Sequence, residues 1–216
     1  MVYAIANPQV STQLIQRAQR KAVRQEIRLL RRSLVFAQQQ TAAKLLDRHL
    51  AGCPAFQRAR NIAIYWPTDG EIGIRPLALR CWSMGKTLFL PVLSPPPGIR
   101  MRFARYTEQT RLKSNRYGIP EPNSSAHQWV RASRLDLLVM PLVAMDLAGN
   151  RIGMGAGYYD KTLQNIATRA LRPTLIGVGH QFQLVEKIVS QSWDIPLDWL
   201  ATDQCLQAVT PVQSHG

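Results

Sequence analysis

The sequence LDLLVMPLVAMDLAGNRIGMGAGYYDK, residues 135–161, decides the fold because it joins a buried strand to a glycine-rich loop and a helix. Residues 135–142 form a nearly uninterrupted apolar run of strand length, as expected for a central parallel strand covered on both faces. Gly153, Gly155 and Gly157 follow at alternate positions. Backbone amides in such a loop can converge on a phosphate group, although a glycine-rich loop alone is equally consistent with a flexible turn.

Charged residues at the two ends of this loop favour the phosphate site. Arg151 carries a permanent positive charge suited to phosphate oxygens. Asp160 carries a carboxylate suited to a hard cation such as Mg²⁺, and a double tyrosine, Tyr158 and Tyr159, lies between them. Together these residues predict a nucleotide site.

Outside this stretch, segments of strand and helix character alternate, which predicts an α/β fold with a mainly parallel sheet. Other strands are predicted at residues 61–66, 87–92, 174–179 and beyond 202, with a hairpin or sheet edge at 101–106. Helices are predicted at residues 12–36, 41–50 with Thr41 as its N-cap, 76–85, about 163–170 and 184–190. Residues 94–98 (SPPPG) favour neither regular state, and residues 117–122 (YGIPEP) predict a rigid turn.

Length and composition predict one domain. The chain has 216 residues, and no run approaches the ~18 consecutive apolar residues that a membrane span needs. The first ten residues lack the pattern of a secretory signal, so we expect a cytoplasmic protein. Cys53, Cys81 and Cys205 are odd in number and widely separated, which indicates reduced thiols rather than disulfides or a zinc site.

The net charge of +14 is concentrated near the N-terminus, where residues 1–60 hold 11 Lys and Arg against 2 acids. Such a surface suits nucleic acid, anionic membrane or a small polyanionic substrate. In the predicted helix 12–36, the face expected in the core carries Ile15, Ala18, Ala22, Ile27, Leu30 and Leu34. A different face carries the arginine strip, defined as Arg17, Arg20, Arg24, Arg28 and Arg31, which could face solvent or an anion.

The loop WPTDGEI, residues 66–72, follows a predicted strand and places Trp66 and Glu71 where open α/β sheets bind ligands. Glu71 is therefore a candidate substrate contact, although an acid in a loop is more often a solvated charge. Asp194 and Asp198 supply two further carboxylates late in the chain.

From about residue 20 to about residue 204, the chain resembles the 5-formyltetrahydrofolate cyclo-ligase family. The resemblance rests on four motifs in order: YWPTDGEI at 65–72, YGIPEP at 117–122, residues 135–160 quoted above, and WDIPLD at 193–198. It implies a Rossmann-like single domain of residues 16–210, related to the sugar-phosphate isomerase and coenzyme A transferase fold, after an N-terminal extension of residues 1–15.

The resemblance also implies an activity, the ATP- and Mg²⁺-dependent closure of 5-formyltetrahydrofolate to 5,10-methenyltetrahydrofolate, with release of ADP and phosphate. The implied catalytic residues are Arg151, Tyr158 and Asp160. The implied ATP contacts are Arg20, Lys21, Arg24, Arg151, Gly153, Gly155 and Gly157. The implied substrate contacts are Trp66, Glu71, Met154, Gly155, Ala156, Gly157 and Tyr158. Asp160 and Asp194 are the implied Mg²⁺ ligands.

Some positions depart from the family pattern. The family's usual lysine before its arginine corresponds to Arg20 with Lys21 beside it, so either residue could contact ATP. Met154 and Ala156 also differ from the usual loop residues. His180 replaces a usual aromatic residue, and we expect it to be an ordinary loop histidine.

Two alternatives stay open. The arginine strip could neutralise phosphates of a nucleic acid, but the chain lacks the interleaved aromatic and basic residues of a base-stacking platform. A sugar-phosphate or coenzyme A enzyme could share the fold without needing these motifs. We expect a monomer that acts on a small folate, with or without a polyglutamate tail, and that needs neither nucleic acid nor membrane.

Overall fold

A computed structural model describes residues 8–93, 100–164, 166, 172–191 and 193–210, with residues 8–16 described by backbone only. The predictions for residues 94–98 and for Ala170, and the side chain of Ile15, lie outside these described residues.

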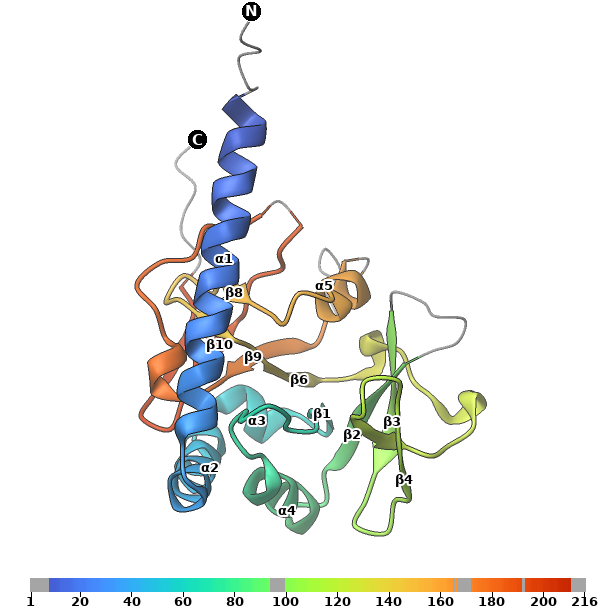
Figure 1. Ribbon diagram of the computed structural model, residues 1–216. Helices are drawn as coiled ribbons and strands as arrows, with labels where there is room; N and C mark the ends of the chain where they lie inside the picture. The colour runs from blue at the N-terminus through green and yellow to red at the C-terminus, as the bar shows by residue number, and fades with distance from the viewer. Residues whose placement is uncertain (1–7, 94–99, 165, 167–171, 192, 211–216) are drawn as a thin grey trace, which may run out of the picture.

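The fold is built on a seven-stranded sheet in which β6, the predicted central strand, lies in the middle (Figure 1). In spatial order the strands are β11 (Leu206–Ala208), β10 (Trp199–Ala201), β9 (Thr174–Val178), β6 (Leu137–Pro141), β1 (Asn61–Ala63), β2 (Thr87–Leu93) and β3 (Met101–Tyr106). The five inner strands are parallel, and the edge strands β11 and β3 are antiparallel. The predicted α/β class is therefore confirmed, as are the mainly parallel sheet and the sheet edge at 101–106.

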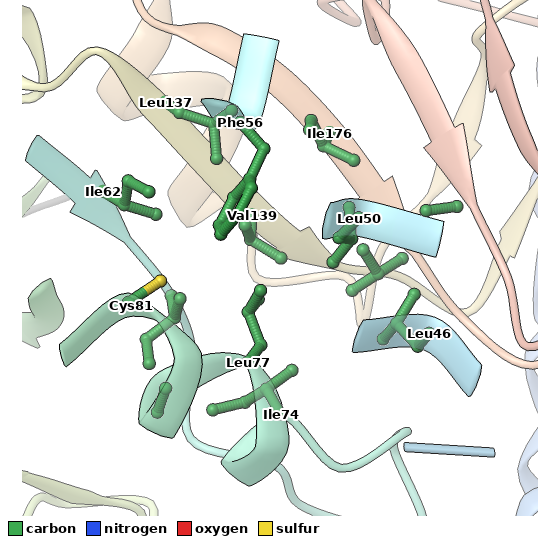
Figure 2. Packing of buried hydrophobic residues seen from close by; sticks show 14 of the residues in the cluster. Leu46, Leu50, Phe56, Ile62, Ile74, Leu77, Cys81, Leu137, Val139 and Ile176 are labelled. Atoms are coloured by element: carbon green, nitrogen blue, oxygen red, sulfur yellow. The ribbon is translucent and has the colours of Figure 1, made fainter. Parts of the chain in front are cut away.

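The apolar run of β6 is buried on both faces of the sheet. Leu137 and Val139 belong to one core cluster, which Figure 2 shows packed around Phe56, while Leu138 and Met140 belong to the cluster on the opposite face. Alternate side chains of a strand point to opposite faces, so a strand covered on both sides must be apolar at every position. This is why the sequence of β6 shows no polar alternation.

Helices cover both faces of the sheet. The cluster around Phe56 is closed by α2 (Phe36–Ala51), α3 (Pro54–Arg58) and α4 (Arg75–Ser83), whereas α5 (Tyr158–Leu163) lies on the opposite side (Figure 1). The longest helix, α1 (Pro8–Ser33), runs along the body, and its N-terminal end projects beyond the rest of the fold (Figure 1). The expected boundary between residues 15 and 16 falls inside α1.

Short elements complete the described fold. They are the hairpins β4 (Leu112–Ser114) with β5 (Pro120–Pro122) and β7 (Ala144–Met145) with β8 (Arg151–Ile152), and the 3₁₀ turns η1 (Ala126–Gln128), η2 (Ala132–Arg134) and η3 (Gln181–Gln183). The predicted turn at 117–122 therefore ends in a strand.

The predicted core face of the first helix is wrong. Ala18 and Ala22 are exposed and Leu30 is 42% exposed, whereas Ile27 is buried. The arginine strip contacts the body of the protein instead, because acidic side chains and a carbonyl oxygen of distant loops accept its hydrogen bonds. The buried face of α1 is thus largely polar.

The predicted boundaries between the first two helices are also wrong. The first helix ends at Ser33 rather than residue 36, and the second begins at Phe36, so Thr41 lies inside it. Val35 is the N-cap residue, and its backbone N–H donates to Gln38 Oε1 at 2.9 Å. That bond satisfies a donor at the helix start that would otherwise lack an acceptor.

The helix predicted at residues 184–190 is absent from that described segment, which has only an isolated bridge. The backbone N–H of Val185 donates to Met145 O at 2.8 Å, and that of Ile188 donates to Asp146 Oδ2 at 2.8 Å. Because these donors bond to the β7–β8 hairpin, they are not available for bonds within a helix.

The two halves of the sheet diverge between β1 and β6. The chain leaves β1 through α4 to reach β2 on one side, and it leaves β6 through α5 to reach β9 on the other. Loops that leave the carboxyl ends of two adjacent parallel strands in opposite directions open a crevice, where open α/β sheets bind their ligands.

Gly177→Ala is expected to destabilise the sheet by about 1–3 kcal/mol, the usual cost of overpacking a core. A Cβ at position 177 in β9 would lie 2.3 Å from Leu197 Cδ1 and 2.9 Å from Leu142 Cδ2. Urea unfolding measures the change. Gly52→Ala is the matched control, because its Cβ would meet nothing closer than His49 O at 3.5 Å. Equal unfolding free energies for the two variants would contradict this packing argument.

Candidate functional site

A cavity of about 890 Å³ opens at the divergence of β1 and β6. Its walls come from α1, from the loop after β1, from the 115–120 turn and from the glycine-rich loop. Nearly all of the predicted site residues line it, namely Arg20, Arg24, Trp66, Glu71, Arg151, Gly153, Met154, Gly155, Ala156, Gly157, Tyr158, Asp160 and Asp194. Lys21 does not line it and is exposed on α1, so the placement favours Arg20 as the residue that reaches a ligand.

The glycine-rich loop presents Arg151 and Asp160 as an ion pair. Arg151 is 7% exposed and donates hydrogen bonds to Asp160 Oδ1 and to Ile195 O. Burial lowers the pKa of Arg151, while the carboxylates of Asp160 and Asp194 oppose that shift. The guanidinium is therefore held rigidly beside the loop.

Two of the glycines are needed for the path of the loop. Gly155 has φ +106° and Gly157 has φ +69°, which is a left-handed conformation that side chains disfavour. Gly157 is the N-cap residue of α5, a helix of six residues. Gly153 has open space where a Cβ would point.

The arginines of α1 form a wall of the cavity that contacts the loop. Arg24 Nε donates to Gly153 O at 2.8 Å. Arg20 pairs with Asp194 Oδ2 at 2.5 Å and donates to Val189 O at 3.0 Å, and its buried Nε has no hydrogen-bond partner among the described residues. Burial, together with the charge of Arg20, lowers the pKa of Arg24. Clustered guanidiniums with unused donors are suited to a polyanion.

Asp160 and Asp194 meet in the same cavity and suit Mg²⁺. Burial raises the pKa of Asp160, and the nearby charge of Asp194 adds to the effect, although Arg151 opposes it. Mg²⁺ is usually held by one or two carboxylates together with substrate phosphates and water. Two carboxylates fit that pattern, and no cluster of three or more His, Cys, Asp or Glu in the described part of the chain forms an all-protein metal site.

The C-terminal part of α1 holds the loop after β1 through three arginines on one carboxylate, here called the Asp69 clamp. The Asp69 carboxylate accepts from Arg28 Nε at 2.6 Å, Arg31 Nη2 at 3.0 Å and Arg32 Nε at 2.5 Å. Burial would raise the pKa of Asp69, but the bonds from Arg28 and Arg32 and the charges of Arg28 and Arg31 outweigh it and lower the pKa. Asp69 also has φ +50°, a conformation uncommon outside glycine.

The clamp places Glu71 inside the cavity rather than in solvent. Its side chain is 8% exposed and lies 3.8 Å from Arg31 Nη1, measured from Oε1. Glu71 Oε2 accepts from the Thr68 backbone N–H at 3.0 Å. Burial raises the pKa of Glu71, although Thr68 and Arg31 oppose the shift. Between the two acids, a Cβ on Gly70 would lie 2.7 Å from Arg31 O, so this close approach requires glycine.

An aromatic group on the 115–120 turn forms the third wall, and the sequence prediction missed it. Tyr158 Oη accepts a hydrogen bond from Arg116, and it lies 3.0 Å from Tyr117 Oη. The hydrogen bond with Tyr117 is the main cause of the lowered pKa of Tyr158, and the Arg116 charge adds to it. Asn115 Oδ1 fixes the turn by accepting from the N–H groups of Tyr117 and Ile119. The Asn at the start of this turn was the available sequence signal.

His180 is not the ordinary loop histidine that was expected. It is 2% exposed, its ring stacks on Phe182 with centroids 5.3 Å apart, and Nε2 lies 3.3 Å from Gly70 O. Burial lowers its pKa. Through its contact with Gly70 O, the buried His180 ring packs against the loop that carries Glu71.

The inward orientation of the arginine strip weakens the nucleic-acid alternative. Arg31 is fully buried, and Arg20, Arg24 and Arg28 bond to the loops of the cavity. These guanidiniums do not form the exposed stripe that a nucleic-acid backbone needs. No described helix is long and apolar enough to cross a membrane.

Comparisons with known proteins agree on one family. The family model described as the 5-formyltetrahydrofolate cyclo-ligase family matches residues 16–203. The chain is 39% identical over 178 residues to the 5-formyltetrahydrofolate cyclo-ligase of Haemophilus influenzae, covering 82% of this chain and 94% of the relative. It is also 39% identical over 176 residues to that of Escherichia coli K12, covering 82% and 96%.

A solved structure supports the same fold. The 5,10-methenyltetrahydrofolate synthetase of Aquifex aeolicus superposes with a TM-score of 0.75 at 27% identity, covering 91% of this chain and 96% of that one. The synthetase of Mycoplasma pneumoniae superposes with a TM-score of 0.66 at 21% identity, covering 85% and 98%, which supports the fold alone.

Proposed function

Because the chain belongs to the 5-formyltetrahydrofolate cyclo-ligase family, we propose that it closes 5-formyltetrahydrofolate to 5,10-methenyltetrahydrofolate while ATP is converted to ADP and phosphate. One observation carries the proposal: a single cavity brings the Arg151–Asp160 loop, the α1 arginines and Glu71 together. A ring closure that uses two substrates needs both of them in one site.

The residues fit the charges of this reaction. Bound ATP supplies the phosphoryl group that activates the formyl oxygen, so that N10 can attack the formyl carbon and phosphate can leave. Arg151, Arg24 and Arg20 provide guanidinium donors for phosphate oxygens, and phosphoryl transfer depends chiefly on such positioning and charge neutralisation. Asp160 and Asp194 would hold Mg²⁺ beside them.

The folate end of the cavity is assigned to Trp66, Glu71 and residues 154–158. Trp66 packs edge-on against Tyr106, with ring centroids 6.4 Å apart, and offers an aromatic surface. Glu71 is buried and suits the N–H donors of a pteridine ring. The Tyr158 hydroxyl contacts Arg116 and Tyr117, and it would lie at the reacting end of the substrate.

A direct assay tests this function. The purified protein is expected to convert 5-formyltetrahydrofolate to a product with the absorbance of methenyltetrahydrofolate only when ATP and Mg²⁺ are both present. Omitting ATP, and omitting Mg²⁺ with a chelator present, are the controls. No change in absorbance with active folate and nucleotide would refute the assignment.

The proposal includes where and in what form the enzyme acts. We propose a cytoplasmic monomer whose residues 16–210 form the catalytic domain, acting on folate with or without a polyglutamate tail. Buried, free Cys53 and Cys81 are consistent with a reducing compartment.

A further inference from the structure

Trp193 is an exposed aromatic side chain at the rim of the cavity. It is 58% exposed and lines the cavity directly before Asp194. Among the described residues it has no hydrogen bond and no ring contact. Tryptophan is usually well buried, and one left open beside a cavity has a large flat surface available for a ligand.

The contacts of α1 place Trp193 at one end of the cavity. Arg31 meets Glu71, Arg24 meets Gly153 and Arg20 meets Asp194, so the helix runs the length of the site. At 1.5 Å per residue, Arg20 lies about 16 Å along the axis from Arg31. Glu71 and Trp193 therefore lie near opposite ends, and the glycine-rich loop lies between them.

The positions of the charged residues along the cavity set the orientation in which ATP would bind. The phosphate groups belong beside Arg24, Arg20 and Arg151, between the Glu71 end and Trp193. The folate occupies the Glu71 end in the function proposed above, on which this inference rests. The base of ATP must therefore extend the other way, toward Trp193.

We propose that Trp193 is the stacking platform for the purine base of ATP. Arg17 lines the same end of the cavity, one helical turn beyond Arg20, and has no ion-pair or hydrogen-bond partner among the described residues. It is placed to contact the ribose or the first phosphate. Stacking is tolerant of base identity, so GTP should bind nearly as well as ATP.

The test measures equilibrium binding by calorimetry in the presence of Mg²⁺, with ATP, inorganic tripolyphosphate and 5-formyltetrahydrofolate as separate probes. Trp193→Leu is expected to weaken the affinity for ATP at least ~10-fold, the usual scale of a lost base stack. The affinities for tripolyphosphate and for 5-formyltetrahydrofolate should stay unchanged. Trp193→Phe keeps a ring and should recover most of the ATP affinity.

A change of tryptophan emission on adding ATP should disappear in Trp193→Phe and persist in Trp129→Phe, because Trp129 does not line the cavity.

Each other outcome counts against the platform. Unchanged ATP affinity in Trp193→Leu would overturn it, as would an equal loss of ATP and tripolyphosphate, which would indicate a damaged phosphate site. Absence of ATP binding to the unmodified protein would overturn it as well. The proposed function fails separately: a protein that binds ATP through Trp193 and yet forms no methenyl product would refute the reaction and keep the platform.

Discussion

Arg151→Ala is expected to lower kcat roughly 100-fold or more, because losing one preorganised donor to developing charge costs about that factor. Arg151 is buried, paired with Asp160 and held by Ile195 O, so no neighbouring side chain can replace its guanidinium from the same position. Asp160→Ala should cost a comparable factor, since it removes a proposed Mg²⁺ ligand and the partner of Arg151. The absorbance assay gives kcat, and thermal unfolding shows whether each variant is folded.

Two further variants make the Arg151 experiment specific. Arg58→Ala is the control, because Arg58 is exposed on α3 and lies outside the cavity. Arg28, on the arginine strip, would be a poor control because it holds Asp69. Arg151→Lys keeps the charge but not the planar fork and should recover little activity. Equal losses in Arg151→Ala and Arg58→Ala would mean that the loop is not the phosphate site.

Asp69→Ala is expected to destabilise the protein by about 2–3 kcal/mol, below the usual cost of breaking a fully buried ion pair, because Arg31 is buried whereas Asp69 itself is 15% exposed. Arg31 is fully buried and would keep only Glu71, at 3.8 Å, as a counter-charge. Urea unfolding measures the loss. The surviving folded protein should also show a raised KM for folate, because the Glu71 loop loses its support.

A matched control and the pH dependence complete this prediction. Arg32→Ala removes a 55% exposed member of the clamp and should cost less than about 1 kcal/mol.

Since the pKa of Asp69 is lowered in the folded protein, the stability that Asp69 contributes to the fold is complete above about pH 5. It is lost as the pH falls below ~3.9 toward that lowered value. Equal small losses in Asp69→Ala and Arg32→Ala would show that the clamp does not support the fold.

Much of the fold was predictable because its signals are local. The apolar run of β6 is continuous because both faces of that strand are buried. The glycine-rich loop was recognisable because its glycines and flanking charges are close in sequence. The loop after β1 could be placed at the ligand-binding edge of the sheet for the same reason.

The orientation of α1 could not be predicted, because it depends on partners far away in the chain. Spacing alone made Ala18 and Ala22 look like core positions. Arg20 faces inward because Asp194, 174 residues later in the chain, accepts its hydrogen bond. Arg28 faces inward because Asp69, 41 residues later, accepts its hydrogen bond. The prediction of a helix at 184–190 was wrong for the same reason, since backbone N–H groups of this segment donate to the β7–β8 hairpin.

Two ion pairs of the cavity, Arg151 with Asp160 and Arg20 with Asp194, join a residue of the proposed phosphate site to a proposed Mg²⁺ ligand. Each of these two carboxylates is neutralised by a guanidinium. In the proposed function, the two arginines would pass to phosphate oxygens and the two carboxylates to Mg²⁺, so that each charged group would exchange its partner in the protein for one in the ligand. A triphosphate without its cation would leave both carboxylates facing phosphate, and this repulsion would weaken its binding.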